Sequence, residues 1–264
     1  MADLTVLSYN VWGNFGPSKK RFRRIAQYLN AAARKYDVDV IVLNEVLWGS
    51  QYDFFARQMG DWKPVNDPFF RKKVPLIRAG GNGVMVLLNV NRGLRIGKVE
   101  HHTFERAVSF DRLASKGFTH VPIITKEGVE CNLFATHLQA EYVYSVLGKQ
   151  FKMQSWSENE RKTIRAQLNQ MASRGRRLPN SFYVGDMNTD DLHLFQSVGL
   201  HSAMCQGNVC GTFFGDGDDK AQHLDHILTQ EPQPNRLRML YNEELKTLSD
   251  HFPIVMRLHF PKPK

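Results

Sequence analysis

Short runs of large and β-branched apolar residues, each closed by polar or turn-forming residues, recur along the chain. Such runs are typical of buried strands. The sequence predicts strands at Leu4–Val11, Val38–Val46, Gly83–Asn89, Phe118–Ile124, Cys131–His137, Ser181–Gly185, His223–Thr229 and Pro253–Leu258. Helical segments interrupt them without the regular alternation of a purely parallel sheet. This favours a layered α/β or α+β domain with a sandwich core.

Two segments repeat their apolar residues at helical spacing instead. Ser18 offers an N-cap, and apolar side chains between Phe22 and Ala33 follow at intervals of three and four residues. Residues Glu158–Met171 combine strong helix formers with apolar side chains at 164, 168 and 171, and predict a second helix. No linker rich in Pro, Gly or Ser divides the chain, so we expect one domain over residues 1–264.

Composition places the chain among ordinary globular proteins. Of its 264 residues, 42% are hydrophobic, 23% charged and 11% aromatic, which excludes fibrous and disordered classes. The longest strongly apolar stretch, Gly83–Val90, is far shorter than the roughly 20 residues of a transmembrane helix. The three cysteines are an odd number without metal-site spacing, so we expect reduced thiols at Cys131, Cys205 and Cys210.

Basic residues outnumber acidic ones, 35 to 26, which gives a net charge of +9. They cluster at Lys19–Arg24, Arg71–Lys73 and Arg174–Arg177. The charge favours anionic partners, nucleic acid or an acidic lipid surface, although solvated basic faces would give the same composition. We expect the cluster at 19–24 to be the solvated face of the first predicted helix. The start, MADLTVLSYN, lacks a basic and then apolar signal region, so we expect a cytoplasmic or non-classically secreted protein, or a trimmed mature chain.

Polar residues capable of chemistry stand at the ends of the predicted strands. They are Asn10, Glu45, His137, Asp186, Asn188, Asp225, Asp250 and His251. A rigid scaffold can bring such groups together from distant parts of the chain. Glu45 follows an apolar run, and a buried carboxylate there needs a partner, either a basic side chain or a hard divalent cation such as Mg²⁺. Asn10 could offer an amide oxygen to the same ion or an N–H to a phosphate.

Acid–base chemistry is indicated by the groups near the carboxyl-terminal strands. Asp186 and Asn188 in GDMN can face one cavity, where one orients a water and the other donates to an oxyanion, although Gly, Asp and Asn are also turn formers. His251 follows Asp250 in SDHFPI, and acidic neighbours raise the basicity of an imidazole into the range of a general base. Asp225 in HLDHIL could accept from that imidazole. His137 ends an apolar strand, where a neutral core histidine is the usual finding.

Six of these segments occur in the order found in one enzyme superfamily. The segments SYNVWGN, LNEV, ATHLQAEY, VGDMN, HLDHIL and SDHFPI resemble the successive signatures of the endonuclease/exonuclease/phosphatase superfamily, from residue 5 to 257. Within it, NVWG, THLQAEY and the segment DRLASKG at Asp111–Gly117 are similar to neutral sphingomyelinases. The resemblance implies a four-layer α/β/β/α sandwich of the DNase I-like type, with two packed mixed sheets flanked by helices.

The same resemblance implies a Mg²⁺-dependent phosphodiesterase, with Mn²⁺ or Co²⁺ as substitutes. Glu45 would be the principal metal ligand with Asn10 beside it, and Asp250 would lie near the metal through water. The superfamily commonly has Gln or Glu before the metal-binding Glu, whereas this chain has Asn44. The shorter amide affects contacts made from that position rather than the metal site itself.

The remaining roles follow from the same match. His251 would activate water, and Asp225 would orient the imidazole of His251. Asp186 and Asn188 would hold the attacking water and a phosphoryl oxygen, and His137 would contact the phosphate or steady the leaving oxygen. One metal, a His–Asp pair and a second His are what phosphodiester hydrolysis needs.

The substrate expected from the resemblance is sphingomyelin or a related choline phospholipid. Asp111 and Lys116 are expected to act on the substrate, with an exposed ion pair as the alternative. Glu141–Trp156 mixes aromatic and basic residues, which suits peripheral contact with a membrane, base stacking on a single strand, or a self-packed loop. A nuclease acting on DNA or RNA would use the same centre and would explain the charge of +9. A non-catalytic scaffold is the third alternative.

Overall fold

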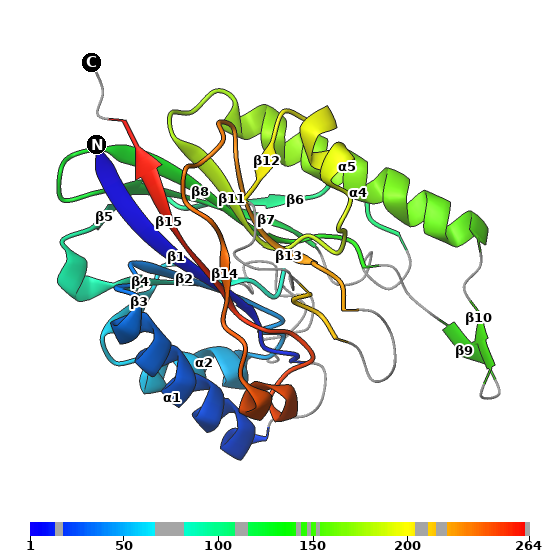
Figure 1. The fold of residues 1–264 in the computed structure, drawn as a ribbon, viewed down its shortest axis with the longest axis horizontal. Helices are drawn as coiled ribbons and strands as arrows, with labels where there is room; N and C mark the ends of the chain where they lie inside the picture. Colours follow the sequence, from blue (N-terminus) through cyan, green and yellow to red (C-terminus); the bar gives the residue numbers. More distant parts are fainter. Residues whose placement is uncertain are drawn as a thin grey trace.

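Two mixed sheets pack face to face in the computed structural model, and helices cover the outer face of each sheet (Figure 1). The structure describes residues 1–13, 18–66, 82–108, 116–140, 144–146, 149–151, 154–203, 211–214 and 221–261. The four-layer α/β/β/α fold predicted from the resemblance is confirmed.

The first sheet has the strand order β14-β15-β1-β2-β4-β3 over the described residues. These strands are β1 (Ala2–Asn10), β2 (Val40–Asn44), β3 (Trp62–Pro64), β4 (Met85–Asn89), β14 (Arg238–Met239) and β15 (Ile254–Phe260). The central strand β1 pairs in parallel with β2 and antiparallel with β15. The helices on this side are α1 (Lys19–Lys35), α2 (Gly49–Gln58) and the 3₁₀ turn η2 (Glu243–Thr247), and the 3₁₀ turn η1 (Val90–Arg92) follows β4.

The second sheet has the order β12-β13-β11-β8-β7-β5, with β6 also pairing with β7. Its strands are β5 (Arg95–Ile96), β6 (Glu100–Thr103), β7 (Gly117–Ile124), β8 (Glu130–His137), β11 (Ser181–Asp186), β12 (His201–Ser202) and β13 (Asp225–Thr229). The helices α4 (Gln154–Gly175) and α5 (Leu192–Ser197) lie on its outer side. Strands β9 (Tyr144–Val146) and β10 (Lys149–Phe151) form a separate antiparallel pair.

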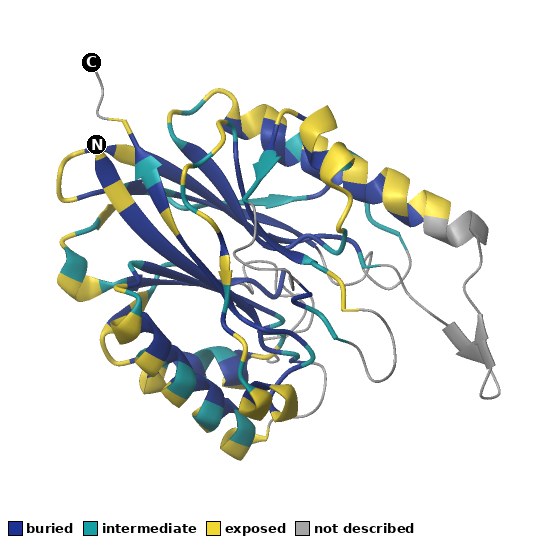
Figure 2. Cartoon of the chain, in the orientation of Figure 1, coloured by how far each residue is buried: buried dark blue, intermediate teal, exposed yellow. Residues whose placement is uncertain are grey.

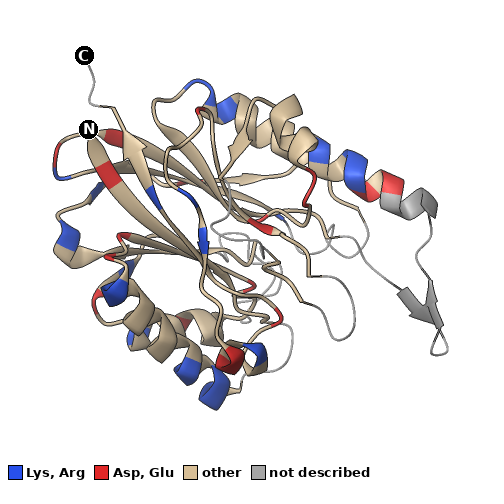
Figure 3. Ribbon diagram, viewed as in Figure 1, with Lys and Arg blue, Asp and Glu red and all other residues tan. Residues whose placement is uncertain are grey.

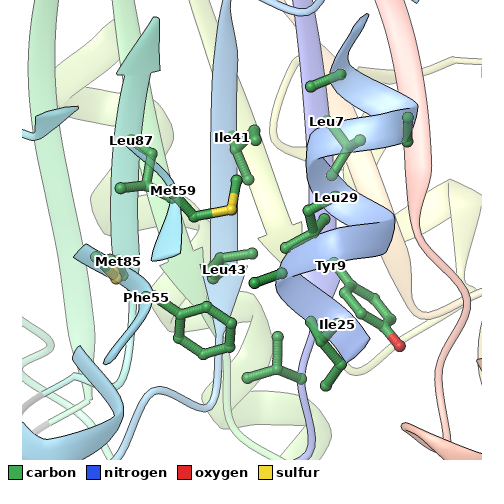
Figure 4. Packing of buried hydrophobic residues seen from close by; sticks show 14 of the residues in the cluster. Leu7, Tyr9, Ile25, Leu29, Ile41, Leu43, Phe55, Met59, Met85 and Leu87 are labelled. Carbon is green, nitrogen blue, oxygen red and sulfur yellow. The ribbon is translucent and has the colours of Figure 1, made fainter. Parts of the chain in front are cut away.

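Buried side chains form three clusters, one for each interface between layers. Alternate residues of β1 serve two of them: Leu4 and Val6 pack between the sheets, whereas Leu7 and Tyr9 pack under α1. Figure 4 shows the second group, in which side chains from β1, β2 and β4 meet α1 and the end of α2. The third cluster joins the second sheet to α4 and α5. Because most strands are covered on both faces, they are buried throughout, whereas the helices expose their outer sides (Figure 2).

The predicted strands are all present, and their ends differ from the prediction by about two residues. Ser18 caps α1, since its hydroxyl accepts the backbone N–H of Arg21 at 3.3 Å. Helix α4 is longer than the predicted 158–171 and runs from Gln154 to Gly175. Helices α2 and α5 and the short edge strands were not predicted. They are brief and partly exposed, and therefore carry little periodic signal.

The basic clusters are mostly solvated, with one exception. Figure 3 shows Lys and Arg along both α1 and α4, and Arg174, Arg176 and Arg177 are exposed. The prediction that the cluster at 19–24 faces solvent is wrong for Arg21, because its guanidinium points inward onto three backbone carbonyls. The cluster at 71–73 lies outside the described residues.

Cys131 is a buried free thiol, and burial raises its pKa to about 12. Cys205 and Cys210 lie outside the described residues. None of the helices in the described part of the chain is both long and apolar enough to cross a bilayer.

The topology brings several strand ends to one edge of the sandwich. Asn10 pairs with Asn44 where β1 and β2 end, and Asp186 pairs with His137 where β8 and β11 end. Asp225 starts the antiparallel strand β13 directly opposite Asp186. Side chains from both sheets therefore meet at this edge.

Candidate active site

The first part of the site is a carboxylate held by the ends of β1 and β2. The amide nitrogen of Asn10 donates to Glu45 Oε1 at 3.1 Å and to Asp186 Oδ2 at 3.0 Å, so it joins the two sheets. The other Glu45 oxygen accepts the backbone N–H of Gly13 at 3.1 Å. The backbone N–H of Trp12 donates to Asn10 Oδ1 at 3.0 Å. Both side chains are thus fixed by the segment that follows β1.

The backbone around Glu45 is unusual. Glu45 has a φ of +63°, in the left-handed region that few non-glycine residues adopt. Gly13 passes so close that a Cβ at that position would lie 1.8 Å from the Glu45 carbonyl oxygen. Outliers of this kind are retained where a site requires them. Here the turn aims the Glu45 carboxylate along the edge of the sheet instead of into solvent.

The second part of the site is a histidine paired with an aspartate. His251 Nδ1 donates to Asp225 Oδ2 at 2.7 Å, and both residues are buried. This bond leaves Nε2 directed toward Asp186 Oδ2 at 3.7 Å and Asp250 Oδ1 at 4.0 Å. The ring of Phe213, with its centroid 5.0 Å away, packs on the imidazole. An imidazole held in this way by one nitrogen can exchange a proton through the other.

The third part of the site surrounds Asp186 from the side of the second sheet. Asp186 Oδ1 accepts the backbone N–H of Asn188 at 2.9 Å, and His137 Nε2 lies 3.7 Å from Asp186 Oδ2. The Asn188 amide donates to the carbonyl oxygen of Leu138 at 3.0 Å, and Lys116 Nζ donates to the same oxygen. Asp186 is consequently the point where groups from both sheets converge.

Burial and like charge perturb the ionisable groups of the site. Burial, and then the charge of Asp250, raises the pKa of Glu45 to about 7, and burial raises the pKa of Asp250 as well. Burial opposes protonation of His251, but Asp225, Asp186 and Asp250 outweigh it and raise the pKa of His251 to about 10. Burial and the charge of Lys116 lower the pKa of His137 to about 3. The site has more carboxylate charge than His251 alone can balance.

This excess of carboxylate oxygen fits a hard divalent cation. In the described part of the chain, Asp186, Asp225 and His251 form a group whose ligand atoms lie within 4.8 Å of one another. Asp225 and His251 are already bonded to each other, however, whereas Glu45 has a raised pKa beside Asp250. The geometry and charge therefore suit a cation on the Glu45 side of Asp186.

The structure brings nearly all of the predicted site residues together. They are Asn10, Glu45, Lys116, His137, Asp186, Asn188, Asp225, Asp250 and His251. Asp111 lies outside the described residues. Within Glu141–Trp156 the structure describes the backbone of β9 and β10 and the first turn of α4.

Sequence reasoning did not find the residues that connect these groups. The buried amide of Asn44 donates to Thr136 O at 2.7 Å and accepts the Asp186 N–H at 3.3 Å, so it links β2 to β8 and β11. The shorter amide at this position thus makes contacts across the sheets. Thr212 Oγ1 accepts the Asp225 N–H at 3.0 Å. Of these connecting residues, only Asn44 could be noticed in the sequence, because it departs from the superfamily pattern.

The fold is similar to that of several solved structures. Sphingomyelinase C from Streptomyces griseocarneus matches with a TM-score of 0.74 and 18% identity, over 98% of this chain and 100% of that one. A beta toxin variant from Staphylococcus aureus with bound magnesium ions gives a TM-score of 0.73 and 18% identity, over 97% and 99% of the two chains. TDP2 from D. rerio, complexed with a single-strand DNA product, gives 0.68 and 16%, over 98% and 100%.

Comparison of sequences identifies the family. No curated protein matches the chain. The profile of the endonuclease/exonuclease/phosphatase family matches residues 7–251, a range that contains every residue of the site. Enzymes of this family are metal-dependent hydrolases of phosphodiester bonds. The profile match, the shared fold and the buried cluster of carboxylates and histidines agree: the chain belongs to the endonuclease/exonuclease/phosphatase family.

Proposed function

We propose that the protein is a Mg²⁺-dependent phosphodiesterase that hydrolyses sphingomyelin, or a related choline phospholipid, at the phosphodiester bond. With sphingomyelin the products are ceramide and phosphocholine. The observation that carries the proposal is the buried His251–Asp225 pair, whose imidazole Nε2 faces Asp186 beside the Glu45 carboxylate. The sphingomyelinase-like segments THLQAEY and DRLASKG, and the fold shared with a sphingomyelinase C, support the choice of lipid.

The chemistry assigned to the residues follows from their positions. His251 Nε2 removes a proton from a water, whose oxygen attacks phosphorus, while Asp225 keeps Nδ1 protonated and stabilises the imidazolium that forms. Asp186 and Asn188 orient that water and a phosphoryl oxygen. The bond between phosphorus and the ceramide oxygen breaks, the released alkoxide takes up a proton from solvent, and the His251 imidazolium returns its proton to solvent. His137, which burial and Lys116 keep neutral, donates a hydrogen bond on this side.

Glu45 would hold the metal ion, with Asn10 beside it and Asp250 contributing through water. Bound Mg²⁺ would supply positive charge to the non-bridging and leaving oxygens of the phosphodiester. Asp225 contributes most to the raised pKa of His251 and stays bonded to the imidazole, whereas Asp186 and Asp250 add to it from the side on which a cation would bind. A cation there would offset the contribution of Asp186 and Asp250 and lower this pKa toward the range in which an imidazole acts as a base.

The runner-up function is hydrolysis of DNA or RNA at the same centre. The net charge of +9 and the fold shared with a TDP2 that was crystallised with a single-strand DNA product favour it. The segment DRLASKG, with Asp111 and Lys116, favours the lipid instead. The two substrates are distinguished by assay.

The deciding experiment compares substrates with one purified preparation. Sphingomyelin vesicles, phosphatidylcholine vesicles, and single- and double-stranded DNA are assayed with Mg²⁺ and with a chelator. His251→Ala, purified in parallel, reports contaminating activity. We expect Mg²⁺-dependent release of phosphocholine from sphingomyelin, which the variant lacks. Efficient DNA cleavage that declines steeply with salt would replace the lipid with nucleic acid.

A separate measurement tests the metal ligand. Glu45→Gln removes the carboxylate charge but keeps the size of the side chain, so the fold should survive. We expect weaker Mg²⁺ binding in calorimetry and loss of most turnover. An unchanged Mg²⁺ affinity in a folded variant removes Glu45 from the metal site.

Contact with the membrane is assigned to residues 141–156. Replacing Tyr142, Tyr144 and Phe151 by Ser removes apolar area and should weaken binding to vesicles. Hydrolysis of a short soluble choline phosphodiester should change little, because the site residues lie outside this segment. If vesicle binding is unaffected, the segment does not meet the membrane.

A further inference from the structure

Arg21 is the one member of the basic run at 19–24 whose charged group is directed into the fold. Its Nη1 donates to the carbonyl oxygens of Val11 at 2.8 Å and Leu248 at 2.6 Å, and its Nη2 donates to that of Trp12 at 2.8 Å. The guanidinium also lies 5.9 Å from the centroid of the Trp12 ring. A planar fork with several fixed donors suits this arrangement of carbonyls, whereas the single ammonium of lysine does not.

The carbonyls that Arg21 binds belong to two different arms of the site. Val11 and Trp12 directly follow Asn10, and the backbone of Trp12 and Gly13 fixes Asn10 and Glu45. We call residues 10–13 the carboxylate arm. Leu248 directly precedes Ser249, Asp250 and His251, and we call residues 248–251 the base arm. Arg21 therefore joins two segments that are more than 230 positions apart in the sequence.

A second link joins the same two arms. The hydroxyl of Ser249 donates to Asn10 O at 2.7 Å and accepts the backbone N–H of His251 at 3.3 Å. Ser249 is buried and stands two residues before His251, whose imidazole binds Asp225. Two links that bridge the same pair of segments fix their separation better than either link alone.

We propose that Arg21 is a positioning residue that sets the distance between the Glu45 carboxylate and the His251 base. The role rests on the proposed phosphodiesterase function, since it matters only if both groups act on one substrate. Arg21 acts through backbone carbonyls and does not touch the substrate. A shift of about 1 Å between groups that react together can lower a rate by about 10²-fold.

The test is Arg21→Lys, which keeps the positive charge and removes the fork. The matched control is Arg24→Lys, one helical turn further along α1, where the guanidinium binds exposed Glu244 at 2.8 and 3.2 Å. We expect Arg21→Lys to lower kcat by about 10- to 10²-fold with KM nearly unchanged, and to weaken Mg²⁺ binding measured by calorimetry. Amide hydrogen exchange should rise at residues 10–13 and 248–251. Arg24→Lys should leave all of these unchanged.

These readouts separate the inference from the function on which it rests. If the wild-type protein hydrolyses no phosphodiester, the proposed function fails, and Mg²⁺ affinity and hydrogen exchange still decide whether Arg21 holds the two arms. Full retention of kcat, Mg²⁺ affinity and exchange protection in Arg21→Lys overturns the inference. A loss of thermal stability with kcat and Mg²⁺ affinity intact also overturns it, because that would be a purely structural role.

A second variant keeps the test decisive if Arg21→Lys does not fold. Ser249→Ala removes the other link, and we expect it to change kcat, Mg²⁺ affinity and exchange in the same two arms. If both variants fold, the double variant should show an effect that differs from the sum of the two single effects, because the two links share the same segments. Strictly additive effects, or an inert Ser249→Ala alongside an unfolded Arg21→Lys, contradict the proposal.

Discussion

At the scale of single residues, Asp225 shows how tightly His251, the proposed base, is held. Its Oδ2 accepts from His251 Nδ1 at 2.7 Å, and its Oδ1 is buried with no hydrogen-bond partner in the described part of the chain. An amide placed here could turn its NH₂ group toward the imidazole and stabilise the wrong tautomer. The residue is therefore required as a carboxylate and not merely as a polar group of that shape.

This requirement predicts the effect of Asp225→Asn. We expect kcat to fall by about 10²- to 10⁴-fold, the range found when a positioned base is lost, in steady-state assays with saturating substrate and Mg²⁺. The thermal midpoint of unfolding serves as the control for folding. Near-normal kcat in a folded variant would show that His251 needs no partner.

Asn44 is a second residue whose role depends on its length. It lies fully buried between the sheets and satisfies Thr136 O and the Asp186 N–H. Asn44→Ala removes both of these buried hydrogen bonds, each of which contributes about 0.5 to 1.5 kcal/mol to stability. We expect lower stability in urea unfolding and a lower kcat, since Asp186 loses a support.

Asn132 provides the matched control for this change. It is also a buried strand asparagine, and its amide donates to Pro179 O at 2.8 Å near the other end of β8. We expect Asn132→Ala to destabilise the fold comparably while kcat stays close to that of the wild type. Equal losses of kcat in both variants would mean that Asn44 contributes only to stability.

The proposed catalytic residues were easier to predict than the residues that position them. Glu45, His137 and Asp186 stand at the ends of apolar runs and can be recognised from local sequence. The contacts of Asn44, Arg21 and Ser249 join positions 92, 227 and 239 residues apart, and nothing near them in the sequence specifies the partner. Predicting these contacts requires the packing of the two sheets.

At the scale of elements, strands β8 and β11 approach each other closely beside the site. Gly185 has a φ of +141°, and a Cβ there would lie 1.9 Å from Thr136 O. Gly185→Ala must push the strands apart just before Asp186. Overpacking of this kind costs about 1 to 3 kcal/mol, so we expect a lower urea midpoint and a loss of activity.

Gly128, in the turn between β7 and β8, separates the effect of backbone strain from the effect of steric overlap. Its φ is +79°, but a Cβ would meet nothing within 4 Å. Gly128→Ala should therefore show the cost of backbone strain alone and leave kcat unchanged. A Gly185→Ala variant no worse than Gly128→Ala would argue against the close approach of the strands.

Among the strands, those that could be predicted are mostly buried on both faces. Strands β1, β2 and β11 are rich in apolar residues and buried except at Asp3, because sheet and helix cover them on opposite sides. The edge strand β12 has only two residues, and α5 has six, so neither gives a measurable period. The end of α4 beyond residue 171 is polar on its exposed side and too short to show a period, so it was not predicted.

At the scale of the whole molecule, buried neutral histidines make stability depend on pH. Burial, and then the charge of His223, lowers the pKa of His226 to about 3, whereas an unfolded histidine titrates near 6.5. His226 is fully buried and hydrogen-bonded to Ser202 at 2.9 Å. Below pH 6.5, His226 binds a proton in the unfolded chain but not in the folded chain, so the free energy of unfolding falls as the pH drops toward 3.

We therefore expect the urea midpoint to decrease steadily between about pH 6.5 and pH 4, since unfolded histidines take up protons in this range. His226→Gln keeps a polar side chain but cannot titrate, and it should reduce the slope of stability against pH even if it lowers stability at pH 7. His193, whose side chain lies in the partly exposed helix α5, offers a control in the form His193→Gln. An identical slope in the wild type and in His226→Gln would exclude His226 as the cause.

The position of β1 between β2 and β15 has a consequence for synthesis. A chain leaving the ribosome carries Asn10 and Glu45 early, but the strand that completes the sheet beside β1 is made only with residues 254–260. His251 emerges just before that strand, and its partner Asp225 belongs to the other sheet. An unfinished chain thus contains only part of the candidate site and lacks His251, the proposed base. We therefore expect activity at this site, whatever its substrate, only after β15 has been made and the two sheets have packed against each other.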